Sequence, residues 1–165
     1  MYNLAALALN LINRLTMKMT VLIIAALVVL AALTLVVQNM TTPTHLGHKD
    51  GKLAPMPSKP NAVSSQTQVA DKQVEALPYK GTKEETLAAL KQVLTQMAGN
   101  EIQASEEGYI YSVFTTPKMH YHDDVELLLD EGQQVVHFRS QSRAGYSDKG
   151  LNRQRYEQFR TLYLM

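Results

Sequence analysis

The chain has 165 residues, enough for one domain with accessory segments, and its 16 Lys and Arg nearly balance its 15 Asp and Glu. Residues 1–60 hold five Lys or Arg and one Asp, a net charge of +4, whereas residues 61–165 hold eleven against fourteen, a net charge of −3. The second part therefore lacks the positive charge on which general nucleic-acid binding depends. Without cysteine, the chain has no disulfides, thiolate nucleophiles, cysteine zinc sites or lipidated N-terminal cysteine.

Residues 1–19 admit two interpretations. Four leucines recur at roughly helical spacing, which is typical of a short amphipathic helix on a membrane surface: Leu4, Leu7, Leu11 and Leu15. The alternative is a misassigned start, because the apolar run that follows Met17 and Met19 resembles the ordinary beginning of an anchored protein. Met1, Met17 and Met19 all stay candidate starts.

Residues 20–37 contain no charged residue, no proline and no glycine. As a helix, these eighteen residues span about 27 Å, close to the thickness of the bilayer hydrocarbon core, and they lack the polar stripe of a soluble helix. A cleaved signal peptide is the competing interpretation. The run exceeds the usual apolar region of a signal peptide, and no A-x-A-like cleavage site follows Val37, so the sequence predicts an uncleaved transmembrane helix.

The charges on the two sides of this run differ. Arg14 and Lys18 precede it, whereas Lys49 and Lys52 follow at a greater distance and are diluted by Asp50. The positive-inside tendency therefore favours a cytoplasmic N-terminus. We expect a single-pass protein of the bacterial inner membrane with a periplasmic C-terminal domain.

Residues 38–60 contain four prolines and two glycines and no periodic apolar pattern, which predicts a flexible linker. His45 and His48 lie in this linker at a spacing that could bind a metal. In a flexible segment we expect a solvated pair instead.

Residues 61–165 are expected to form one soluble domain. Residues 61–66 are polar and predict a loop that docks on the domain, and residues 69–79 predict a short strand or extended segment ending at Pro78. Thr82 and Glu85 form a capping box that starts a helix, which Gly99 ends. One face of this helix is apolar: Leu87, Leu90, Leu94 and Met97.

Four strand candidates follow, over residues 101–105, 109–116, 125–129 and 135–142, with turn signals at residues 107–108 and 131–132. The short connections predict an antiparallel meander. Asp148 is expected to cap a last helix over residues 150–162, with Tyr156, Phe159 and Tyr163 on its apolar face. The fold class is therefore α+β: a transmembrane helix, then a helix, a four-stranded antiparallel sheet and a C-terminal helix, with both helices of the domain on one sheet face.

Residues 139–155 concentrate four arginines, an aspartate, an asparagine, three serines and two glycines in seventeen positions. Strand alternation puts Arg139 and Arg143 on one face with His137 and Gln141, about 13 Å apart along the strand. A hairpin about residues 131–132 would bring Asp123 near Arg143, and a guanidinium pairs well with a carboxylate. The segment is the main candidate site of the chain.

Two interpretations of this segment stay open. The first is an internal network that fixes the sheet edge to the last helix. The second is a site for an anionic small molecule, lipid headgroup or glycan, aided by the N-terminus of the last helix. The candidate residues are Arg139, Arg143, Asp148, Asn152, Arg153, Arg155, Asp123, Asp124, Asn61, Ser64 and Ser65.

A charge count bears on this choice. Residues 139–160 hold six Lys or Arg against two acids, and residues 101–131 hold eight acids against one Lys. The six basic residues of the first segment nearly balance the eight acids of the second. This balance of charge favours internal pairing. Arg153 and Arg155 fall on different helix faces, however, so one of them should lie outside the network.

Catalysis is less well supported. No G-x-S-x-G elbow surrounds Ser64 or Ser65, and His137 faces away from Ser140 on strict alternation. We predict no catalytic residue, no metal site and no cofactor, and we expect His120 and His122 to be a solvent-facing pair. The rival to a binding site is a small periplasmic hydrolase with Asp123 or Asp148 as general base.

Three motifs carry a family resemblance: Asn61-Ala-Val-Ser-Ser-Gln66, Asp123-Asp-Val-Glu126 and the segment from Arg139 to Arg155. Together they resemble the bacterial and plastid domain-of-unknown-function family 1499, over about residue 60 to the C-terminus. The resemblance implies a membrane-anchored or exported protein and no known activity. The chain departs from the family at Ala62, where members commonly carry cysteine.

The interpretation that joins these observations is a membrane-anchored envelope protein with a non-enzymatic binding or accessory module. Besides the hydrolase, a structural partner of another membrane protein is an alternative. It predicts an exposed apolar patch on the free face of the sheet.

Overall fold

The computed structural model describes residues 3–165, so the candidate start Met1 lies outside the described residues. The chain divides into two compact units, one up to Gln38 and one from Asn39 to Met165. Helix α1 (Leu4–Met40) is continuous for 37 residues, so the leucines of residues 4–15 and the apolar run lie in one helix. With a mean hydropathy of 3.0 in its most apolar window, α1 is long and apolar enough to cross a membrane.

The second unit is built on a six-stranded antiparallel sheet, two strands more than predicted. Its strands are β3 (Ala62–Ser64), β4 (Leu77–Pro78), β5 (Asn100–Glu106), β6 (Tyr109–Thr115), β7 (His122–Asp130) and β8 (Val135–Ser142). Strands β5 to β8 form the predicted meander, and the short strands β3 and β4 both pair with β8. The prediction of a loop at residues 61–66 was wrong for β3, because three residues are too few to show alternation.

Strand β7 is longer than the predicted 125–129. Asp123 and Asp124 belong to it and lie opposite Ser142 and Gln141 of β8. The sequence pattern ended at the apolar residues, whereas the ladder of backbone hydrogen bonds continues through the two acids. This extension decides where both carboxylates point.

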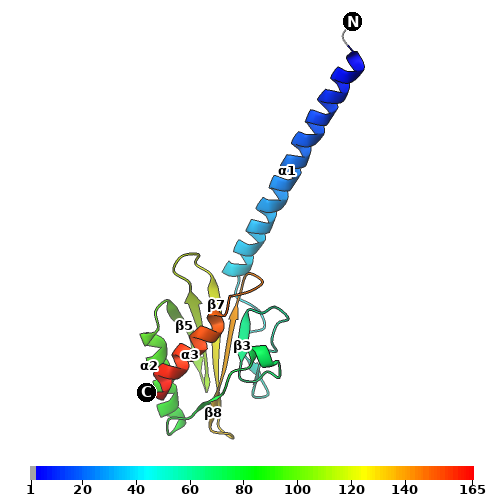
Figure 1. The fold of residues 1–165 in the computed structure, drawn as a ribbon. Coiled ribbons are helices and arrows are strands. Elements are labelled where there is room, and N and C mark those ends of the chain that lie inside the picture. The colour runs from blue at the N-terminus through cyan, green and yellow to red at the C-terminus, as the bar shows by residue number, and fades with distance from the viewer. Residues whose placement is uncertain (1–2) are drawn as a thin grey trace. The chain divides into compact units, whose positions relative to one another are not determined.

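Helices α2 (Lys83–Gln96) and α3 (Leu151–Leu164) cover the same face of the sheet (Figure 1). The capping box at the start of α2 is confirmed: Thr82 Oγ1 accepts from the Glu85 N–H at 3.2 Å, and the Glu85 carboxylate accepts from the Thr82 N–H at 2.7 Å. A short 3-10 helix, η1 (Ala70–Lys72), interrupts the segment before β4.

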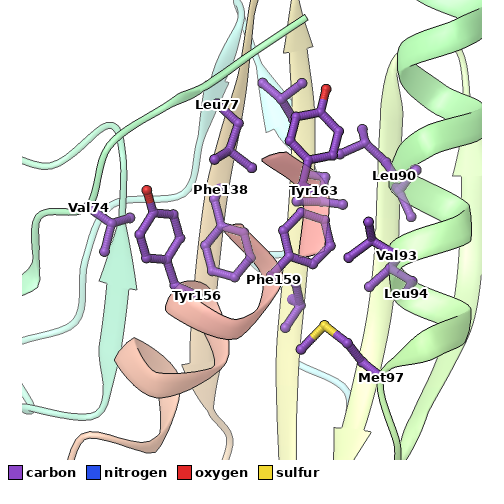
Figure 2. Close-up of a cluster of buried hydrophobic side chains, with 14 of the residues drawn as sticks. Val74, Leu77, Leu90, Val93, Leu94, Met97, Phe138, Tyr156, Phe159 and Tyr163 are labelled. Carbon is purple, nitrogen blue, oxygen red and sulfur yellow. The ribbon is translucent and has the colours of Figure 1, made fainter. Parts of the chain in front are cut away.

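The core lies between this sheet face and the two helices (Figure 2). Phe138 of β8 packs its ring 5.2 Å from that of Tyr156, and Phe159 and Tyr163 continue the row along α3. Helix α2 contributes its predicted apolar face, including the fully buried Leu90. The helices therefore take the face of β8 that carries Val136 and Phe138, which leaves the arginine face of this strand on the other side.

Part of the segment predicted as a flexible linker lies on that other side of the sheet. It contains a hairpin of β1 (His48–Lys49) and β2 (Lys52–Leu53), and Leu53 is buried. The Gly47 N–H donates to Glu126 Oε1 at 2.7 Å, and the His48 ring lies 5.5 Å from the ring of Tyr109. These contacts cover the polar sheet face, and the flexibility of the segment stays a prediction.

Candidate functional site

The residues of the arginine-rich segment point to both faces of the sheet. In β7, Asp123 faces the helices and Asp124 faces away, because consecutive strand residues alternate. In β8, Ser140 and Ser142 face α3, whereas Arg139 faces away from the helices, as does Arg143 just after the strand. The segment therefore builds two polar clusters, one on each side of the sheet.

Asn152, in the first turn of α3, is the centre of the cluster on the helix side. Its fully buried side chain donates to Asn61 O at 3.0 Å, to Ser142 Oγ at 3.0 Å and to Asp148 Oδ2 at 2.7 Å. Its amide oxygen accepts from the Ser140 hydroxyl and from Arg155 Nη1. One side chain of α3 thus joins the residue before β3, strand β8 and the loop before α3.

Arg155 completes this cluster. Its Nη2 lies 2.6 Å from Asp123 Oδ2, and both side chains are almost wholly buried. The guanidinium also lies over the Phe114 ring, 4.7 Å from its centroid. This ion pair ties α3 directly to β7.

The cluster on the opposite face holds the other two ion pairs. Arg139 Nη1 donates to Glu126 Oε2 at 2.7 Å, and Arg139 Nη2 contacts Gln141 and lies 3.2 Å from His45 Nε2. Tyr109 donates to the second oxygen of Glu126 at 2.8 Å. Burial raises the pKa of the Tyr109 phenol, and the neighbouring Glu126 carboxylate raises it further.

Arg143 binds Asp124, with three N···O distances of 2.8–3.0 Å. The prediction that Asp123 lies near Arg143 was wrong, because the Asp123 side chain points to the helix side of the sheet. Tyr111 completes the group: its hydroxyl donates to Asp124 at 2.6 Å and accepts from Arg143 at 2.9 Å. Burial raises the pKa of Tyr111, and its hydrogen bond to Asp124 raises it further.

Asp148 was expected to cap the last helix, but the helix begins one residue later, at Leu151, and Gly150 holds the N-cap position. Its carboxylate accepts from the N–H groups of Gly150 at 3.0 Å and Asn152 at 2.8 Å. The positive end of α3 is therefore already occupied by a carboxylate of the protein. This arrangement weakens the expectation that the helix end helps to bind an external anion.

Arg153 is the arginine of the segment that lies outside both clusters. Its Nη2 donates to the carbonyl oxygens of Asp71 at 3.1 Å and Gln73 at 2.9 Å, and within residues 3–165 it has no carboxylate partner. It lines two surface grooves, of about 740 and 570 Å³. The larger groove also presents Ser65, Glu75, Tyr156, Glu157 and Arg160, and the smaller one presents Lys72, Tyr146 and Asp148.

The residues around β3 are mostly held by backbone groups. Ser64 is buried and accepts from the Gln66 N–H at 3.1 Å, and Asn61 donates to Ser142 O at 3.2 Å. In the described part of the chain, Asn61 Oδ1 and Arg139 Nε are buried without a hydrogen-bond partner.

Ser65 lies beside a histidine that sequence reasoning had not placed there. Its hydroxyl accepts from the Phe138 N–H at 2.9 Å and lies 3.3 Å from His137 Nδ1, while His137 Nε2 lies 3.7 Å from Asp130. Ser65 follows the last residue of β3, and its hydroxyl takes the place of a strand carbonyl opposite Phe138. No local signal in residues 61–66 predicts this, because the contact depends on how β3 pairs with β8.

The other histidines hold structural contacts. His122 Nδ1 lies 3.0 Å from Asn39 O, and the His120 carbonyl accepts from Asn39 Nδ2 at 2.8 Å. Among residues 3–165, no three His, Cys, Asp or Glu side chains gather in a metal-binding arrangement.

A family model described as protein of unknown function (DUF1499) matches residues 52–162. The chain belongs to this family. The DUF1499 match extends from β2 to α3 and contains both polar clusters as well as Arg153. No curated protein matches the chain.

Proposed function

We propose that the protein is a membrane-tethered, non-enzymatic binding or accessory module that holds an anionic group beside Arg153. The chemistry is that of a phosphate or carboxylate, carried by a small molecule, a lipid headgroup or a glycan. The anchor is α1, whose length and hydropathy suit a membrane span. The flanking charges favour a cytoplasmic N-terminus, which in the proposed bacterial inner membrane puts the second unit in the periplasm.

One observation supports this proposal above the others. Arg139, Arg143 and Arg155 are each paired with a buried carboxylate, whereas Arg153 makes hydrogen bonds to backbone carbonyls through one nitrogen only. A guanidinium has five N–H donors in a fixed fork, so Arg153 keeps donors for a ligand in either groove. Arg160 also lines the larger groove, but it lies 3.3 Å from Glu75 in an ion pair, so Arg153 is the arginine of this groove without a carboxylate partner in the described residues.

The hydrolase alternative receives less support. A general base needs a carboxylate that can take a proton from a substrate or a water. Asp123 is buried against Arg155, and Asp148 accepts three hydrogen bonds at the start of α3. Both acids are thus engaged in holding the fold.

The test uses the full chain in phosphatidylcholine nanodiscs, titrated with sodium pyrophosphate by isothermal calorimetry. We expect Arg153→Gln to weaken binding about tenfold or more, because a hydrogen bond to a charged group contributes about 1.5–3 kcal/mol. Lys91→Gln, an exposed cation on α2, is the matched control and should bind as the unaltered chain does. Equal affinities of the unaltered chain and Arg153→Gln would contradict the proposal.

A second arm separates the sources of the anionic group. Nanodiscs that contain phosphatidylglycerol offer a headgroup phosphate with a net negative charge, whereas the phosphate of phosphatidylcholine is neutralised by its choline. If the ligand is a headgroup, these nanodiscs should compete with pyrophosphate, and the competition should vanish in Arg153→Gln. A soluble ligand predicts equal pyrophosphate affinity in both kinds of nanodisc.

A further inference from the structure

Asn39, two residues beyond the apolar run, is fixed within the second unit. Its side chain donates to His120 O at 2.8 Å and accepts from the His122 N–H at 2.8 Å. Its backbone carbonyl accepts from Arg143 Nη1 at 3.4 Å and lies 3.0 Å from His122 Nδ1. Asn39 is therefore buried against the start of β7 and the end of β8.

This position limits how far the second unit can lie from a membrane. Each helical residue advances about 1.5 Å, so Asn39 lies about 3 Å along the helix from Val37. If residues 20–37 cross the bilayer, as proposed above, the headgroup layer begins at this point and is about 5–8 Å thick. The loops around His122 and Arg143 must then lie in or next to that layer.

The exposed side chains at these loops suit such a position. Residues 39–165 expose seven large hydrophobic side chains, and four of them belong to residue 40 and to the two loops: Met40, Met119, Tyr121 and Tyr146. A common pocket of about 230 Å³ brings the two loops together; it is lined by Tyr121 of the first loop and by Ala144, Gly145, Ser147, Asp148 and Lys149 of the second. Figure 1 shows the β6–β7 loop and the loop after β8 at the same end of the sheet.

The loops also carry the charge expected of a lipid contact. Lys118 and Lys149 are exposed on them, beside Met119 and Tyr146, which are 66% and 73% exposed. Tyrosine is favoured at the membrane–water interface, and lysine is attracted to anionic headgroups. A solvent-facing loop gains nothing from two exposed aromatics and a methionine, whereas a loop in the headgroup layer buries them.

We propose that residues 117–121 and 144–149 form a second membrane contact beside the anchor. In this contact Met119, Tyr121 and Tyr146 enter the headgroup layer, and Lys118 and Lys149 lie against lipid phosphates. The contact rests on the proposed anchor and adds to it, because it fixes which end of the sheet faces the bilayer.

The chain contains no tryptophan, so single tryptophans can report depth in the bilayer. Full-length Met119→Trp is placed in vesicles of phosphatidylglycerol and phosphatidylcholine with lipids brominated near the headgroup. We expect its fluorescence to be quenched. Leu164→Trp is the control: it is also exposed, but lies about 20 Å further along α3 from residue 151, and should stay unquenched.

Leu30→Trp, within the apolar run, separates the two proposals. Quenching of Leu30→Trp by lipids brominated deep in the acyl chain shows that the anchor is in place. If Leu30→Trp is quenched and Met119→Trp is quenched no more than Leu164→Trp, the second contact is overturned while the anchor stands. If Leu30→Trp is not quenched, the anchor itself fails and both proposals fall. In a Met119→Trp chain that also carries Lys118→Gln and Lys149→Gln, shallow quenching should decrease.

Discussion

The ion pair of Arg155 and Asp123 allows the internal network to be tested by a single substitution. Arg155→Met keeps much of the apolar stem but removes the guanidinium, which leaves Asp123 as an unpaired carboxylate that is 1% exposed. Removing one partner of a buried pair costs about 3–5 kcal/mol. The substitution also removes the hydrogen bonds from Arg155 to Ser140 and Asn152.

This cost is a large part of the total, because domains of this size unfold with about 5–15 kcal/mol. Urea unfolding of the full chain in detergent, followed by tyrosine fluorescence, should show a midpoint well below that of the unaltered chain. Arg153→Met on the same helix is the control, since its guanidinium has no carboxylate partner within residues 3–165. We expect it to cost less than about 1 kcal/mol.

The double variant Asp123→Leu with Arg155→Met sharpens the test. Replacing a whole buried ion pair by apolar residues is often nearly neutral, so the double variant should be more stable than Arg155→Met alone. The coupling between the two sites should be about 0.5–3 kcal/mol. Equal midpoints for Arg155→Met and Arg153→Met, or strictly additive losses, would refute the argument that these buried charges act as a pair.

Two further predictions concern the core and a turn. Burial raises the pKa of Tyr163 to about 12, whereas an unfolded tyrosine titrates near 10, so its contribution to stability is complete below about pH 10 and is lost as the pH rises towards 12. The urea midpoint should therefore be lower at pH 11 than at pH 9. In Tyr163→Phe this drop should be smaller, and an equal drop in the variant would count against this reasoning. Gly99 has φ +77°, and an added Cβ would lie 2.8 Å from Thr115 O, whereas at Gly51, with φ +72°, it would meet nothing within 4 Å. Gly51→Ala should cost about 1–2 kcal/mol from backbone strain and Gly99→Ala clearly more, and equal urea midpoints would show that the close approach to Thr115 is unimportant.

Local signals predicted the elements that depend on local chemistry. The capping box of Thr82 and Glu85 fixed the start of α2, and alternation fixed the faces of β6 and β8, because both patterns act within a few residues. Strand β3 was missed because it is three residues long and forms only by pairing with β8, whereas β4 lies at the end of the segment predicted as a short strand or extended segment up to Pro78. Their stability comes from a neighbour distant in the sequence.

The polar clusters show the same contrast between what local sequence predicts and what depends on distant contacts. The nearly equal numbers of basic and acidic residues in the two segments favoured internal pairing, and three arginines are indeed paired. The sequence did not show which acid each arginine meets. Asp123 and Asp124 both belong to β7, so their side chains point to opposite faces of the sheet. The sequence could not show this, because it depends on the residue at which β7 begins to pair with β8.

The position of these pairs gives a reason for their chemistry. A buried ion pair often stabilises a fold no better than apolar residues of the same size, so stability alone does not explain the pairs in both clusters. The pair of Asp124 and Arg143 also binds the carbonyl of Asn39, at the end of the sheet that the proposed anchor would hold against the bilayer. The pair thus fixes Asn39 at the end of the sheet where the exposed side chains of Met119, Tyr121 and Tyr146 lie, and the proposed membrane contact depends on that position.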